Sequence, residues 1–173
     1  MKEFLIDYYS ITTKSFEILA ALTGVFLYKK YKNTPVKYFI WILVAIAFIE
    51  LVGSYTFYVE DFEFLHPVRD FLKGTAFEEN NWFYTIFWKL GATIAFAFYF
   101  IHLIEKVLFK NLIKIVVFLF LICAITTIVQ NFNDFFVKSF TIIDITSSLV
   151  IITAVFLYLI QWLQSDKILT FYK

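Results

Sequence analysis

Five apolar segments dominate the 173-residue chain and limit what it can fold into. Each segment reaches or nearly reaches the roughly 20 residues that a helix needs to cross the hydrocarbon core of a bilayer. Their expected bounds are 8–28, 38–58, 82–104, 113–130 and 139–163. Lipid offers no hydrogen-bond partners, so a spanning segment must be a helix or belong to a closed barrel. The segments are continuously apolar and do not alternate, which favours helices over barrel strands.

The composition agrees with a membrane environment. Hydrophobic residues make up 61% of the chain and charged residues 17%, whereas soluble domains average about 45–50% and about 25%. So few polar residues cannot cover the surface of a soluble domain of this size. A net charge of +1 excludes a basic nucleic-acid binder, and the single cysteine, Cys123, excludes an internal disulfide. We therefore expect residues 1–173 to form one all-α integral membrane bundle whose main partner is the lipid bilayer.

The first segment is the least clear of the five because it contains two charges, Lys14 and Glu17. They lie three residues apart, so on a helix they share a face and partly neutralise each other. The charge-free run that follows, 18–28, is only 11 residues long. We favour a spanning helix here, and the alternative is an amphipathic helix lying in the membrane interface.

The connection 59–81 is the longest and is predicted to contain a short interfacial helix. Apolar side chains recur there at helical spacing, namely Phe64, Leu65, Val68, Phe71 and Leu72. Pro67 and Gly74 are suited to starting and ending such a helix.

Lysines in the connections predict how the segments are oriented, because cytoplasmic loops carry an excess of Lys and Arg. The first connection has four lysines and no acid, the third has three lysines and one acid, and the second is acidic overall. The lysines are Lys29, Lys30, Lys32, Lys37, Lys106, Lys110 and Lys114. This pattern predicts that the first and third connections lie on the cytoplasmic side of a bacterial inner membrane. Five spans then leave the N-terminus and the connection 59–81 outside, and the C-terminus inside.

Four charges lie inside the segments at a similar depth. They are Glu17, Glu50, Lys89 and Asp144, one from each of four segments. At a rise of 1.5 Å per residue they lie about 8–14 Å below the outer boundary. A charge inside the hydrocarbon costs about 2.5–3.5 kcal/mol on insertion scales, so such groups normally face the bundle interior and pair. Three acids and one lysine leave at least one carboxylate that must take up a proton, bind a cation or contact water.

Hydroxyl groups are expected to complete a polar pocket around these charges. Ser54, Thr93 and Ser148 each follow one of the charges by four residues and so share its helix face. Tyr55 is the fourth hydroxyl residue expected there. The sequence therefore predicts a pocket in the outer half of the bundle that binds or senses a small ligand, an ion or a proton. The structural alternative is that the charges pair only to hold the helices together.

Two other functions stay open. One is an oligomeric pore or channel, for example a membrane-disrupting defence effector, and the other is a scaffold subunit of a membrane complex. Small residues four apart, Ala20 with Gly24 and Gly91 with Ala95, are typical of close helix contacts. The chain has no Gly-rich phosphate loop, no G-x-S-x-G and no H-E-x-x-H, so we expect no enzyme, cofactor or metal centre.

Two stretches near the start and one near the end resemble a family of small bacterial inner-membrane proteins that is itself uncharacterised. The stretches are 17–24 (EILAALTG), 28–35 (YKKYKNTP) and 165–169 (SDKIL). Members of that family have a seven-span pattern, whereas this chain ends at Lys173 after the fifth segment. The resemblance implies a shorter relative or a truncated form, and it supports the topology without implying any chemistry.

Overall fold

The computed structural model describes residues 2–165, and the side chains of residues 11–165. Every regular element in the described range is a helix. Five helical stretches there are long and apolar enough to cross a membrane: Ile11–Tyr31, Val36–Asp61, Asn81–Leu103, Val107–Gln130 and Thr141–Leu163. The predicted all-helical architecture is thereby confirmed, and so is the first segment as a helix of spanning length. Membrane insertion and orientation stay predictions. Of the stretch 165–169, only Ser165 belongs to the described residues.

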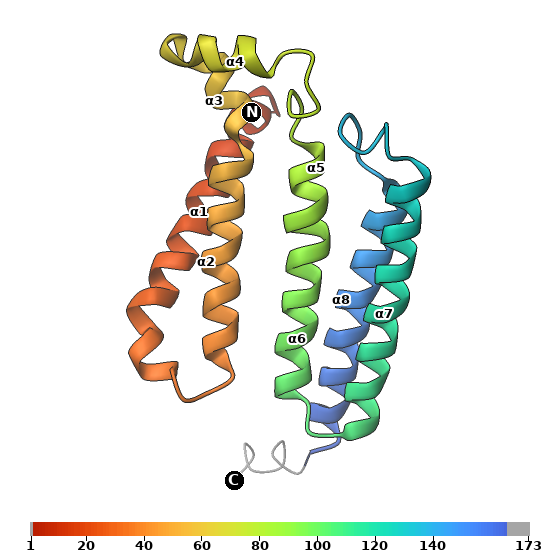
Figure 1. Ribbon diagram of the computed structural model, residues 1–173. Coiled ribbons are helices and arrows are strands. Elements are labelled where there is room, and N and C mark those ends of the chain that lie inside the picture. Colours follow the sequence, from red (N-terminus) through yellow and green to blue (C-terminus); the bar gives the residue numbers. More distant parts are fainter. Residues whose placement is uncertain (1, 166–173) are drawn as a thin grey trace.

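The helices form two groups. α1 (Lys2–Tyr31) and α2 (Val36–Gly53) form an antiparallel hairpin, and α6 (Thr93–Leu103), α7 (Val107–Gln130) and α8 (Thr141–Leu163) pack together beside it (Figure 1). The main cluster of buried apolar side chains belongs to the second group and includes Ala97, Ile113, Phe120, Ala124, Ile143, Val150 and Ala154. The hairpin meets this group chiefly through α2.

Gly24 allows α1 and α2 to approach closely. A Cβ atom at this position would lie 3.1 Å from Cγ2 of Ile40. The predicted close contact is confirmed for Gly24. It is wrong for Gly91, which is exposed and lines an apolar groove together with the half-buried Ala95.

The second span is interrupted at Gly53 and Ser54, which sequence analysis did not predict. α2 ends at Gly53, and α3 (Tyr55–Asp61) begins after Ser54, whose φ and ψ are −79° and 9°. Asn80 Nδ2 donates a hydrogen bond to the Gly53 carbonyl over 2.7 Å. Gly–Ser pairs are common positions for helix kinks. A Cβ atom at Gly53 would lie 2.9 Å from Cζ of Tyr84, so the absent side chain makes room for the Tyr84 ring.

Replacing Gly53 by alanine is expected to destabilise the protein by about 1–3 kcal/mol, the usual effect of overpacking. The new methyl group would collide with Tyr84 and, at 3.0 Å, with Phe83. The melting temperature in detergent measures the effect. Gly91→Ala is the comparison variant and should cost less, because its Cβ atom would meet no ring and only one atom, the Ile86 carbonyl oxygen at 3.3 Å. A Gly53→Ala protein that melts at or above the wild-type temperature would contradict this account of the contact.

The third span contains a π-helix. α5 (Asn81–Phe83) leads into η2 (Tyr84–Ala92), a π-helix of nine residues, which continues as α6. π-helical turns are rare, mostly a single turn long, and frequent at functional sites. η2 carries both Tyr84 and Lys89, so its unusual winding decides which neighbours these two side chains reach.

The connection 59–81 holds the predicted short helix. η1 (Glu63–Leu65) precedes α4 (His66–Leu72), which has Pro67 in its first turn and lies crosswise to α2 next to α3 (Figure 1). Gly74, with φ of 76°, ends the turn that follows. The helix itself is confirmed, and its place in a membrane interface stays a prediction.

α7 begins at Val107, six residues earlier than the expected start at 113. Lys110 and Lys114 therefore lie within its first turns, where lysine is a good helix former although it interrupts the apolar pattern. The Gln161 side-chain oxygen accepts hydrogen bonds from the backbone N–H groups of Glu105 (2.7 Å) and Lys106 (3.0 Å). These bonds hold the short turn between α6 and α7 against α8.

Candidate functional site

Lys89 and Asp144 form an ion pair that joins η2 to α8. The Lys89 ammonium contacts Asp144 Oδ1 and donates a hydrogen bond to Ser139 Oγ over 2.6 Å. Ser139 in turn donates to Asp144 Oδ2 over 3.3 Å. The Lys89 side chain is 17% exposed and the Asp144 side chain 43% exposed. Asp144 therefore neutralises the charge of Lys89, and Asp144 and Ser139 together accept two of the hydrogen bonds that its ammonium can donate.

A cavity of about 270 Å³ adjoins this ion pair. Its polar lining consists of Lys89, Asp144, Thr93, Ser147 and Ser148. The two serine hydroxyls donate hydrogen bonds to the Asp144 backbone carbonyl, over 2.9 Å and 2.8 Å. The structure thus brings together Lys89, Thr93, Asp144 and Ser148 of the predicted set.

Glu50 belongs to a second cluster, between α2 and η2. The Tyr84 hydroxyl donates a hydrogen bond to Glu50 Oε2 over 3.2 Å. Ser54, which is fully buried, donates to the Glu50 backbone carbonyl over 2.7 Å and not to the carboxylate. Ser54 therefore supports the turn that carries Glu50.

Glu17 of α1 lies close enough to Glu50 for the two carboxylates to interact electrostatically, and it also interacts with Lys14. Its Oε2 atom is buried and has no hydrogen-bond partner among the described residues. The Lys14 ammonium lies 5.5 Å from the ring centroid of Phe57. Glu17 and Glu50 thus form an acidic pair in which one oxygen has no donor in the described part of the chain.

The four predicted charges therefore divide into two clusters. Among the described residues, no ion pair connects Lys89 to Glu17 or Glu50. Tyr55 belongs to neither cluster, because its hydroxyl lies 2.7 Å from the Phe77 carbonyl oxygen and 2.9 Å from that of Glu79. Tyr55 anchors the connection 59–81 to α3. The expectation of a single pocket is therefore corrected to two separate clusters. Charges at the same depth of a bundle need not be neighbours.

Sequence reasoning missed two participants, Ser139 and Tyr84. Ser139 had no signal from helix capping, because the N-cap residue of α8 is Phe140 and Ser139 bonds the Lys89 and Asp144 side chains. Tyr84 had none, because its reach to Glu50 depends on the π-helix and on the close approach at Gly53.

Comparison of the chain with protein-family models, with curated proteins and with solved structures finds no match. Within the described residues, no group of three or more His, Cys, Asp or Glu side chains is arranged to hold a metal ion. Any functional conclusion rests on the geometry and charge of the two clusters.

Proposed function

We propose that the chain is a multi-pass protein of the bacterial inner membrane that binds or senses a proton or a small cation at Glu17 and Glu50. One observation carries the proposal. The acidic pair holds a buried carboxylate oxygen without a partner in the described residues, while the ammonium of Lys89 is already bound to Asp144. The proposed orientation is the one that the lysines predict, with the N-terminus outside and the acidic pair in the outer half.

The energetic argument concerns two like charges in a medium of low polarity. Neighbouring carboxylates disfavour simultaneous ionisation, and a lone charge inside the hydrocarbon costs about 2.5–3.5 kcal/mol on insertion scales. The hydrogen bond from Tyr84 supports one negative charge in the pair. Lys14 offsets part of the second charge, and in this proposal a proton or a bound cation offsets the rest.

Binding at this pair would act on helix packing. Glu17 belongs to α1, Glu50 to α2 and Tyr84 to η2, so three elements meet at the acidic pair. A proton or cation removes the repulsion between α1 and α2. Binding shifts the equilibrium between two packing arrangements of α1 against α2. The size of the shift equals the difference in the binding free energy of the proton or cation between them. In this proposal the Lys89–Asp144 pair has a supporting role and holds η2 against α8.

Infrared spectroscopy of the protein in liposomes tests the proposal. The wild type is expected to show the band of a protonated carboxyl group in choline buffer, and Na⁺ or raised pH is expected to diminish it. Glu17→Gln and Glu50→Gln should each remove this band, because the remaining carboxylate no longer has a second negative charge beside it that favours protonation. Asp134→Asn is the control, since Asp134 forms an exposed ion pair with Lys138.

Two results would overturn the proposal. One is a wild-type spectrum without a protonated carboxyl band, together with a melting temperature that does not respond to Na⁺ or pH. The other is a band that persists unchanged in both glutamine variants, which would place it on another residue.

A further inference from the structure

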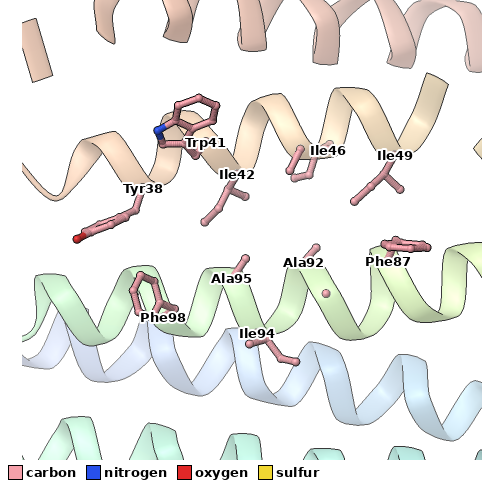
Figure 2. A pocket seen from close by; sticks show the side chains of 12 residues that line it. Tyr38, Trp41, Ile42, Ile46, Ile49, Phe87, Ala92, Ile94, Ala95 and Phe98 are labelled. Carbon is pink, nitrogen blue, oxygen red and sulfur yellow. The ribbon is translucent and has the colours of Figure 1, made fainter. Parts of the chain in front are cut away.

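An apolar groove of about 490 Å³ lies between α2 and the facing helix formed by η2 and α6. Ile42, Ile46 and Ile49 of α2 point across it toward Ala92 and Ala95 (Figure 2). The small alanine side chains leave space that larger residues would fill. Since the hairpin meets the three-helix group mainly along this line, the groove is an opening in the contact between the two groups.

The groove lining is almost wholly apolar, but one end lies next to the basic α1–α2 turn. Tyr38 and Trp41 line the end next to the α1–α2 turn, and the remainder of the lining is aliphatic or phenyl (Figure 2). The ammonium of Lys37 lies 5.0 Å from the ring centroid of Tyr38. The ring of His102 is 4.7 Å from that of Tyr38. The turn 29–37 contains four lysines and no acid. A basic end beside an apolar channel complements an amphiphile with an anionic head.

The length of the groove fits one acyl chain. Tyr38 and Ile49 are 11 residues apart on the helix, which corresponds to about 16 Å. Half of the hydrocarbon core of a bilayer is about 15 Å. The groove therefore covers one leaflet, the cytoplasmic one in the orientation proposed above. Tyr38 and Trp41 lie at the level where aromatic side chains meet lipid headgroups.

We propose that this groove binds one anionic phospholipid of the cytoplasmic leaflet. An acyl chain lies between α2 and α6, and the phosphate contacts the lysines of the turn 29–37. The bound chain completes the packing of the hairpin against the three-helix group. This inference rests on the membrane insertion proposed above and is independent of the acidic pair.

Native mass spectrometry tests the inference with the full chain. The protein is reconstituted into vesicles of equal parts phosphatidylcholine and phosphatidylglycerol, extracted in mild detergent, and weighed with its retained lipids. We expect one retained phosphatidylglycerol. Ala95→Phe should lower retention about tenfold or more because the ring fills the groove. Lys37→Gln should lower it about fivefold, as expected for one lysine near an anionic headgroup.

Matched variants elsewhere on the chain serve as controls. Leu149→Phe changes an exposed position on α8, and Lys138→Gln removes a lysine at the opposite end of the bundle. Both should retain the lipid at the wild-type level. If Ala95→Phe fails to fold, as judged by its melting transition, Lys37→Gln still tests the headgroup contact without altering the groove.

Several results would overturn the inference. They are equal retention of phosphatidylcholine, retention that Ala95→Phe leaves unchanged in a folded protein, a retained fatty acid in place of a phospholipid, and a dimer without lipid. Flotation of the vesicles separates the two proposals. A chain that floats with the vesicles but retains no lipid refutes only this inference, whereas a chain that does not float refutes the membrane insertion as well.

Discussion

Replacing Asp144 by asparagine is expected to lower the stability of the protein by about 2–4 kcal/mol. The substitution leaves the Lys89 ammonium, whose side chain is 17% exposed, without its counter-ion. Breaking a buried ion pair by removing one partner typically costs about 3–5 kcal/mol. We expect a loss at or below the lower end of that range because the Asp144 side chain is 43% exposed. The melting temperature in detergent, followed by tryptophan fluorescence, measures the loss.

Two controls make the result specific to the buried pair. Asp134→Asn breaks the exposed pair with Lys138 and should cost less than about 1 kcal/mol. The double variant Lys89→Met with Asp144→Asn should recover most of the stability, because no charge is then left without a partner. If the double variant is as unstable as the sum of the single ones, the two side chains are not coupled and the role assigned to the pair is wrong.

Replacing Tyr84 by phenylalanine is expected to destabilise the protein by about 1.5–3 kcal/mol, the usual contribution of a hydrogen bond to a charged group. The variant removes the hydroxyl that donates to Glu50 Oε2 and keeps the ring that packs at Gly53. The melting temperature should fall by roughly 2–4 °C for each kcal/mol.

Tyr99→Phe is the matched control, because Tyr99 is also half-buried in the stretch Asn81–Leu103 and its hydroxyl forms no hydrogen bond with the described residues. In the Glu50→Gln background the effect of Tyr84→Phe should shrink, since the acceptor is then neutral. An equal loss in both backgrounds would mean that Tyr84 acts through its packing and not through Glu50.

The fold was largely predictable, and the departures from prediction have identifiable causes. The five helices of spanning length and the short helix before Gly74 follow from apolar length and from turn residues, which are local properties. The break at Gly53–Ser54 and the π-helix 84–92 could not be predicted from the apolar pattern, because neither interrupts the apolar run in which it lies. They arise where α2 and η2 approach closely, and this approach is a property of the packed structure.

The charged residues of the candidate site were predictable, but the partner of each was not. Apolar runs with one or two charges predict, from the sequence alone, that Glu17, Glu50, Lys89 and Asp144 need partners, because hydrocarbon offers none. Position along a segment gives the depth of each charge but not the direction in which its side chain points. The tertiary structure alone decided that Lys89 reaches Asp144 on α8 while Glu50 meets Tyr84 and Glu17. The physical reason is that the partner of each charge depends on helix packing, which here combines the close approach at Gly53 with a π-helix that carries both Tyr84 and Lys89.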